Sequence, residues 1–433
     1  MVLSRKFSRT AKSPPTGTVR SPMRHRTKVA AAAGSAVALI GVGLALSLNA
    51  HAAPAPPATV MYGTLDTQAA TAATESAGGV KMAMMEFDWA DYETSQGTFS
   101  ASYMAGIQTQ LKAYKAAGMK VTLGLGMAAP PQWVFKLANA TYIDQNGNVS
   151  AEPDFVFSAA VRAAAVTYLN KIAANVPLST FWAIRLNSGG DGEMLYPGGT
   201  GWWAFNPSAL TGSGLPTGMT KNPDPSWKPG TAGLTKAQLA TWITWYVKGL
   251  DNVTGWQMTT LSGLGFTGYY QLLTPGSGTR PDVLTEAEAA NLPADGTTNA
   301  GAVWQLYYAD LPSTSNVMAY ISSVADQSGD NDTCLASDDS LALTTPSMDS
   351  WSATRWITRI ANQYGLTVGG ENPGYNDPAS LNTFYTNTST TGEMAVSLAQ
   401  ARSCGFTVFY WAHDTDLWDG TLPFADYAAE ISS

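Results

Sequence analysis

The sequence predicts an α/β protein of the (β/α)₈ barrel class, folded as a single domain. Two observations lead to this prediction: a repeated helix, glycine and strand pattern, and a total of eight strand-like segments. The composition agrees, because 433 residues with 45% hydrophobic content are enough to bury one large core.

The repeated pattern occurs three times. In each copy an amphipathic stripe ends at a glycine, and a segment rich in β-branched and aromatic residues follows at once. A glycine suits the left-handed position after a helix, and short helix-to-strand connections are typical of parallel α/β folds. The three glycines are Gly118, Gly365 and Gly405.

Eight segments have the composition of strands. In chain order they cover residues 60–65, 80–87, 120–127, 181–187, 261–273, 316–322, 366–370 and 406–412. Helix-like segments lie between them, so the strands are expected to be parallel and to close into a barrel. The stretch 198–233, rich in Gly, Pro and Trp, is too long for an ordinary connection, and it is expected at the active face of the barrel.

The N-terminus is typical of an export signal. Residues 1–28 carry eight basic residues and no acid, an apolar run follows from 29 to about 48, and Ala50-His51-Ala52 suits signal peptidase. The expected domains are therefore a signal peptide at 1–52, an Ala/Pro linker at 53–59 and the barrel at 60–433. An uncleaved N-terminal anchor is the alternative, since the run is long enough to span a bilayer. Met23 is an alternative start that gives a signal of ordinary length.

Charge and cysteine content suit an extracellular protein. Removal of residues 1–52 leaves 16 basic and 32 acidic residues, a formal charge of −16, which argues against nucleic acid or an anionic membrane as partner. No second apolar run of membrane-spanning length follows. Cys334 and Cys404 are the only cysteines. In an exported chain such a pair predicts one disulfide, with two separate buried thiols as the alternative.

Two glutamates follow predicted strands in glycine-rich sequence. Glu193 lies in GGDGEMLYP after the fourth strand, and Glu371 lies in GGENPG at the end of the seventh. The carboxyl ends of the strands form the active face of a barrel, and glycine lets a backbone approach a substrate closely. Two carboxyl groups flanking one bond are what glycosidic cleavage needs. Either Glu can instead be a cap, an ion-pair member or a solvated loop acid, and Asp191 is a rival for the acid/base role.

Further polar and aromatic residues near strand ends are candidates for binding a sugar. Aromatic faces pack against the C–H patches of sugar rings, although tryptophan is more often a core residue. Glu86 and Asp88 end the second strand and can bind sugar hydroxyls; membership of structural ion pairs is an equal alternative. The candidate substrate-binding residues are Glu86, Asp88, Trp89, Trp133, Asn187, Tyr270 and Trp411.

Other chemistries lack the residues they need. After residue 52 the sole histidine is His413, so histidine-rich zinc sites are excluded and a catalytic triad would have to use it. The acidic loop with Asp326, Asp330 and Asp332 does not have EF-hand spacing and is expected to be solvated rather than to hold Ca²⁺. No phosphate-binding or dinucleotide-binding glycine motif is present, and no cofactor is expected.

Three segments resemble those of family 42 β-galactosidases and their relatives. They are MMEFDWADYETSQGTF at 84–99, AAGMKVTLGLG at 116–126 and AAPPQW at 128–133, which lie within a span of about 50 residues. The family has its acid/base Glu directly after an Asn, whereas here Ser188 follows Asn187 and Glu193 lies six positions on. Residues 189–197 instead resemble a segment of β-amylases, which invert configuration.

The resemblance implies a barrel glycosidase of the clan whose catalytic acids follow strands 4 and 7. The expected function is a secreted glycoside hydrolase that cleaves a β-linked oligo- or polysaccharide with retention, Glu193 acting as acid/base and Glu371 as nucleophile. The carboxyl groups are then expected about 5–5.5 Å apart, against roughly 6.5–9.5 Å for inversion. The alternatives are an inverting enzyme of β-amylase type and a carbohydrate-binding barrel without catalysis.

Overall fold

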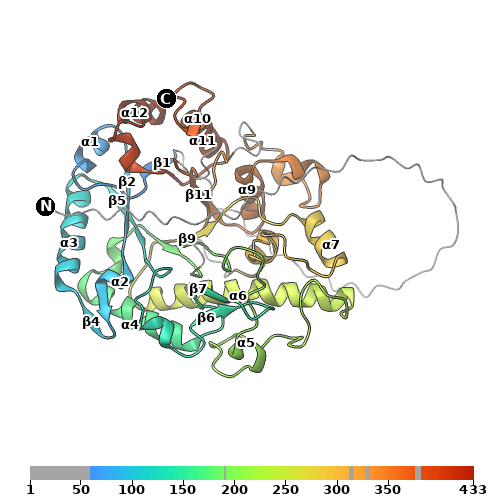
Figure 1. Ribbon diagram of the computed structural model, residues 1–433. Helices are drawn as coiled ribbons and strands as arrows, with labels where there is room; N and C mark the ends of the chain where they lie inside the picture. The colour runs from blue at the N-terminus through green and yellow to red at the C-terminus, as the bar shows by residue number, and fades with distance from the viewer. Residues whose placement is uncertain (1–58, 190–191, 312–315, 327–331, 376–381) are drawn as a thin grey trace, which may run out of the picture. The chain divides into compact units, whose positions relative to one another are not determined.

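The computed structural model describes residues 59–433 except 190–191, 312–315, 327–331 and 376–381 (Figure 1). Eight parallel strands close into a barrel in which each strand pairs with the next barrel strand along the chain, and the last pairs with the first. The barrel strands are β1 Met61–Thr64, β2 Met82–Glu86, β5 Lys120–Gly124, β8 Ala183–Leu186, β9 Tyr269–Thr274, β10 Val317–Ile321, β11 Thr367–Glu371 and β12 Val408–Trp411. The predicted (β/α)₈ barrel is therefore confirmed.

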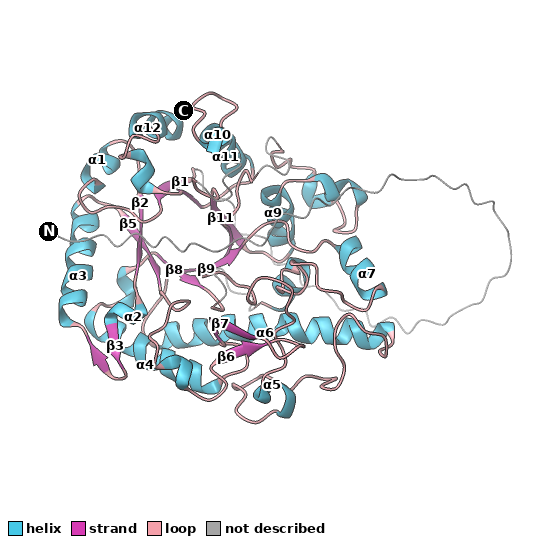
Figure 2. Cartoon of the chain, viewed as in Figure 1, coloured by secondary structure: helices cyan, strands magenta, loops and turns pink. Residues whose placement is uncertain are grey.

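Helices surround the strands (Figure 2). They are α1 Ala72–Ala77, α2 Trp89–Tyr92, α3 Ala101–Ala116, α4 Ala159–Asn175, α5 Pro207–Thr211, α6 Lys236–Gly263, α7 Pro281–Ala289, α8 Trp304–Asp310, α9 Ala353–Gln363, α10 Asn382–Tyr385, α11 Glu393–Ser403 and α12 Phe424–Ser432. Two small hairpins, β3 Glu93–Ser95 with β4 Thr98–Phe99 and β6 Thr141–Ile143 with β7 Val149–Pro153, lie outside the barrel. Within the described residues no helix is long and apolar enough to cross a membrane.

The glycines of the repeated pattern behave as expected. Gly118, Gly365 and Gly405 have φ of 75°, 69° and 65°, which is the left-handed region that side chains with a Cβ rarely adopt. Each lies two positions after the last residue of a helix, and β5, β11 and β12 begin shortly afterwards. The sequence thus encodes these three helix ends locally.

The prediction for the fifth strand was wrong in its first half. Leu261 belongs to α6, a helix of 28 residues that begins with a capping box at Thr235 and buries Leu261 on its apolar face. The strand itself, β9, covers only Tyr269–Thr274. A short apolar run between glycines has no clear period, so sequence alone does not separate a helix end from a strand.

Alternate residues of the strands divide the core into two layers. A small cluster fills the barrel interior, and a larger one lies between the strands and the helices. The interior cluster comprises Leu65, Met82, Met84, Leu273, Met318, Tyr320, Val408, Tyr410 and Ala412. Because side chains alternate along a strand, the residue two beyond an interior one also points inward. This rule identifies Glu86 and Ser322 as inward-facing residues at the ends of their strands.

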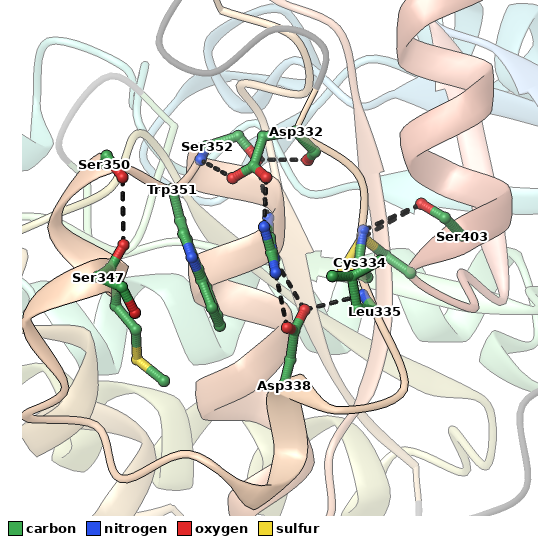
Figure 3. Close-up of polar contacts among 12 residues, drawn as sticks. Asp332, Cys334, Leu335, Asp338, Ser347, Ser350, Trp351, Ser352 and Ser403 are labelled. Carbon is green, nitrogen blue, oxygen red and sulfur yellow. Dashed lines mark hydrogen bonds and ion pairs between the residues drawn. A yellow bond between two sulfur atoms is a disulfide. The ribbon is translucent and has the colours of Figure 1, made fainter.

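The expected disulfide joins Cys334 to Cys404 and is confirmed. It connects the long segment after β10 to the end of α11, and the backbone N–H of Cys334 also donates to Ser403 Oγ at 3.2 Å (Figure 3). In the same segment Arg355 of α9 pairs with Asp332 and Asp338. Asp332 is therefore part of an ion-pair network, while Asp330 lies outside the described residues.

Candidate active site

Glu371 is the last residue of β11, at the carboxyl end of the barrel, and only 8% of its surface is exposed. The two preceding glycines are required by packing. A Cβ at Gly369 would lie 2.7 Å from Met318 Sδ, and one at Gly370 would lie 2.5 Å from the carbonyl oxygen of Ile321. The glycine pair therefore lets β11 fit against β10, which differs from the expected close approach to a substrate.

Arg185 and Tyr320 hold the carboxyl group of Glu371. Arg185 of β8 forms an ion pair with Oε2, and the Tyr320 hydroxyl of β10 donates to the same oxygen at 2.5 Å. The guanidinium carbon of Arg185 lies 4.7 Å from the centre of the Tyr320 ring. Burial opposes the charge of Arg185, but the neighbouring Glu371, Tyr320 and Glu86 raise its pKa above the usual value. A permanent positive charge therefore faces Glu371.

Glu193 is held near the end of β8 despite its distance in sequence from Asn187. The backbone N–H of Ser188 donates to the Glu193 carbonyl at 2.9 Å, so Glu193 lies beside the residue that follows Asn187. The next residue, Met194, donates its N–H to Leu273 of β9 at 2.9 Å. The rival acid, Asp191, lies outside the described residues. Glu193 is thus tied to two neighbouring barrel strands.

Both glutamates contact the same strand. The Ser322 hydroxyl, just beyond β10, donates to Glu193 Oε1 at 2.6 Å, and Tyr320 of β10 binds Glu371. Tyr320 and Ser322 lie on one face of the strand, with Cα atoms about 6.6 Å apart. The two carboxyl groups therefore reach neighbouring positions at the inner edge of the barrel mouth.

Glu86 adds a third acid to this mouth. Its Oε1 accepts the backbone N–H of Gly126 at 2.8 Å. A Cβ at Gly124, its partner in the β2–β5 register, would overlap the Glu86 carboxyl. Burial raises the pKa of Glu86 to about 7, against the lowering effects of Arg185 and the Gly126 N–H. The Glu86 side chain is nevertheless exposed to solvent.

Three of the aromatic candidates are core residues. Trp89 is fully buried, stacks on Tyr168 at 4.9 Å and donates its indole N–H to Glu93. Trp411 is fully buried against Tyr385. Tyr270 is 4% exposed and faces the outer layer, where its hydroxyl donates to the Met258 carbonyl. None of the three leaves a ring face for a sugar, because neighbouring side chains of the core cover the rings.

The remaining candidates have mixed positions. Asp88 caps α2 by accepting the N–H of Asp91 at 3.0 Å, which is a structural role. The Asn187 side chain is buried and accepts the N–H of Gly189 at 3.2 Å. Trp133 is partly exposed on the loop after β5 and keeps its place as a candidate sugar platform.

A histidine and an aspartate lie near Glu371 at the mouth. His413 Nδ1 and Asp66 Oδ2 are 3.0 Å apart, and both side chains are about half exposed. Burial lowers the pKa of His413, but the hydrogen bond and charge of Asp66 outweigh it and raise the pKa above the usual value. Across the described ranges, no group of three His, Cys, Asp or Glu side chains is arranged to hold a metal ion.

Arg185, Tyr320 and Ser322 were not predicted as site residues. A usable pattern was present, because Arg185 stands among apolar residues in β8 and a charge inside a strand needs a partner. Tyr320 and Ser322 have no such mark in the sequence. Their role follows only from the position of β10 between the strands that carry the two glutamates.

Comparison with solved structures gives the same architecture. The catalytic domain of the β-amylase from Paenibacillus polymyxa matches 87% of this chain and 99% of its own, with a TM-score of 0.58 and 15% identity. The β-galactosidase of the psychrophilic Marinomonas ef1 matches 86% of this chain, with a TM-score of 0.52 and 13% identity. That of the haloarchaeon Halorubrum lacusprofundi has a TM-score of 0.51, 13% identity and 86% coverage. This chain spans 58% and 57% of the two β-galactosidases.

The chain thus shares the barrel fold of these proteins at low identity. The comparison with protein-family models gives no match, and the comparison with curated proteins gives none.

Proposed function

We propose that this protein is a secreted glycoside hydrolase that cleaves O-glycosidic bonds in a β-linked oligo- or polysaccharide. The observation that carries the proposal is the convergence of Glu193 and Glu371 on one face of β10, through Ser322 and Tyr320. Two carboxyl groups that flank a cleft are the minimum apparatus of glycosidic cleavage. Two structural neighbours, a β-amylase and a β-galactosidase, add support.

In this mechanism Glu371 is the nucleophile. Among the described residues, the hydrogen bonds to its carboxyl group reach Oε2, from Arg185 and Tyr320. Oε1 is then the oxygen that attacks the anomeric carbon, while Arg185 counters the negative charge of the attacking group. As the glycosyl ester forms, charge leaves the carboxylate, and the two donors fix its orientation throughout.

Glu193 is the general acid and then the general base. It protonates the leaving oxygen in the first step and removes a proton from water in the second. The Ser322 hydroxyl donates to Glu193 Oε1 and fixes the orientation of this carboxyl group. Glu86, with its raised pKa, is a binding group for sugar hydroxyls beside this pair, because it can donate or accept near neutral pH.

The test is a release assay on residues 53–433 with a panel of aryl glycosides and neutral polysaccharides. Glu371→Gln is expected to lose nearly all turnover while it keeps substrate binding, and Glu193→Gln is expected to keep turnover of aryl glycosides whose leaving group needs no proton. Glu286→Gln, on the exposed surface of α7, is the matched control and should be fully active. Full activity in Glu371→Gln contradicts the assignment.

The same assay separates the alternatives. The anomer released first, followed by proton NMR, is the retained one under this proposal, whereas the inverted anomer indicates that Glu371 activates water instead. Binding without any release indicates a carbohydrate-binding barrel. Secretion rests on residues 1–52, and intact-mass measurement of exported protein should show a chain that begins at residue 53.

A further inference from the structure

The rim of the barrel beside Glu371 carries a pair of polar side chains that the proposed mechanism does not use. His413 follows β12 and Asp66 follows β1, and their Nδ1 and Oδ2 atoms are 3.0 Å apart. The sheet pairs Thr64 of β1 with Trp411 of β12. The two polar residues therefore hold matching positions, each two residues beyond that pair. Their side chains are 43% and 57% exposed, so a ligand can reach them. We call them the His413–Asp66 pair.

Asn372 joins this pair to the nucleophile. It follows Glu371 directly, and its side-chain amide binds both backbone groups of Ala412. Its Oδ1 accepts the Ala412 N–H at 2.8 Å, and its Nδ2 donates to the Ala412 carbonyl at 3.1 Å. His413 is the next residue of the chain. The ends of β11 and β12 are thus fixed to each other immediately beside the pair.

Backbone hydrogen bonds fix the loops that carry the pair. The N–H of Leu65 donates to the Trp411 carbonyl at 2.9 Å, and the N–H of Asp414 donates to the Leu65 carbonyl at 3.0 Å. Asp66 itself has a φ of 53°, a left-handed conformation that aspartate adopts more readily than most residues. A ligand that binds groups held in this way loses little free energy to ordering them.

The pair has hydrogen-bonding atoms left for a ligand. Among the described residues, the hydrogen bond to the Asp66 carboxyl group reaches Oδ2, and that to the His413 ring reaches Nδ1. A Cβ at Gly374 would lie 3.2 Å from His413 Nε2, so the glycine leaves this edge of the ring uncovered. Asp66 Oδ1 and His413 Nε2 therefore offer a ligand an acceptor and a ring nitrogen on neighbouring residues of the rim.

The charges around the pair favour a neutral ligand. Desolvation lowers the pKa of His413, but the hydrogen bond and charge of Asp66 outweigh it, and Glu371 and Asp416 raise the pKa further. Desolvation raises the pKa of Asp66, but His413 and Arg185 outweigh it and lower the pKa overall. Arg185 is already paired with Glu371. Both basic groups named here thus have an acidic partner, so they offer no unpaired positive charge to an anionic sugar.

The place of the pair on the rim decides which sugar it meets. Glu193, which protonates the leaving group, accepts from Ser322 just beyond β10, on one side of β11. β12 and β1 follow on the other side. The departing group therefore lies toward β10, and the sugar that is transferred to Glu371 extends toward the pair. Neighbouring strands are about 4.8 Å apart, so β1 is within about 10 Å of β11, a distance that a sugar ring and its hydroxyls can bridge.

We propose that the His413–Asp66 pair binds two neighbouring hydroxyls of the neutral sugar that is transferred to Glu371, and so determines which sugar the enzyme accepts. This inference rests on the proposed function. With Nδ1 donating to Asp66, Nε2 of the charged imidazole donates to one hydroxyl oxygen, and Asp66 Oδ1 accepts the proton of the next hydroxyl. A sugar with either hydroxyl on the opposite face of its ring leaves one of these groups unpaired and is rejected.

The first test follows His413 itself, because it is the only histidine in residues 53–433. That protein, prepared with isotope-labelled histidine and without a histidine tag, gives one imidazole to follow by NMR. The probes are the methyl glycosides of galactose, glucose, mannose and xylose, together with the sugar of any aryl glycoside that the wild type hydrolyses. At least one probe is expected to shift the His413 signal.

Two variants show whether the pair acts as a unit. Asp66→Asn keeps the size of the side chain and tolerates the left-handed backbone. It should lower the pKa of His413 and weaken the response to the sugar about tenfold. Glu286→Gln, on the exposed surface of α7, makes the same change of charge and should respond as the wild type does.

The second test uses aryl glycosides that lack a single hydroxyl. Loss of a hydroxyl that the pair binds should lower kcat/KM of the wild type about tenfold or more. The same loss should cost His413→Phe little, because the partner is already missing. Equal factors in the two proteins, or no sugar-dependent shift of the His413 signal, overturn the proposal. A sugar-dependent shift without turnover of any glycoside would leave the binding pair standing and remove the proposed hydrolase activity.

Discussion

Removal of the Cys334–Cys404 disulfide is expected to lower stability by an amount that the structure allows us to calculate. The two residues are 70 positions apart, and the bridge fixes the long segment after β10 to the end of α11. In the chain-entropy model, closing a loop of this length stabilises the fold by about 4 kcal/mol at 25 °C. Unfolding entropy for a chain of about 380 residues is about 0.8 kcal/mol/K, so Tm should fall by about 5 °C.

The native contacts around the bridge make this calculation appropriate. Arg355 still pairs with Asp332 and Asp338 when the sulfurs are gone, and Cys334 still has its backbone bond to Ser403 (Figure 3). The folded state therefore keeps its shape, and the loss comes mainly from the greater freedom of the unfolded chain.

The assay is calorimetry of a double Cys→Ser variant at 334 and 404 beside the oxidised and reduced wild type. The reduced wild type should have the same Tm as the variant. Ser403→Ala removes the hydroxyl contacts to Cys334, Cys404 and the Gln400 carbonyl but keeps the disulfide, so it should shift Tm by much less. Thiol titration of the denatured, unreduced wild type should find no free thiol. Two reactive thiols, or a variant with the Tm of the oxidised protein, would refute the reasoning.

Three further predictions concern the barrel. Ser322→Ala removes the hydroxyl on Glu193 and should lower kcat by about tenfold with little change in fold, as steady-state kinetics and circular dichroism would show; an unchanged kcat contradicts the contact. Gly124→Ala forces the Glu86 carboxyl away from its position, so KM should rise more than kcat falls; unaltered kinetics would count against Glu86 as a binding group. Burial raises the pKa of Asp154 from 3.8 to about 8, so the stability linked to this group is present at low pH and is lost as pH rises toward 8. The Tm of Asp154→Asn relative to that of the wild type should therefore increase as the pH rises from about 5 to about 8. If the Tm values of the two proteins change in parallel with pH, the raised pKa of Asp154 is contradicted.

The strand pattern was predictable because it depends on residues that are close together in the sequence. Gly118, Gly365 and Gly405 each mark a helix end that no distant contact needs to define, and the strands after them follow directly. The start of the fifth strand was predicted too early, because the short apolar run that begins at Leu261 suits a helix end as well as a strand. There the deciding contact is the burial of Leu261 in the outer layer, which is tertiary.

The location of the two glutamates near the carboxyl ends of strands was predictable for a similar reason. A barrel places the ends of its strands on one rim, so an acid after a strand is expected at the mouth whatever else the chain does. The aromatic candidates had no such constraint. Trp89 and Trp411 lie near strand ends, as a sugar platform would, but they are fully buried among other rings.

The sequence by itself determined the class of fold, the order of the strands, the disulfide and the positions of Glu193 and Glu371 along the chain. Only the tertiary structure decided that Arg185 and Tyr320 hold Glu371, and that Ser322 links Glu193 to the same strand. The physical reason is that helix ends and strand periods depend on neighbours in sequence, whereas an ion pair inside a barrel joins residues 186 positions apart. The register of the closed sheet, which no local pattern specifies, brings them together.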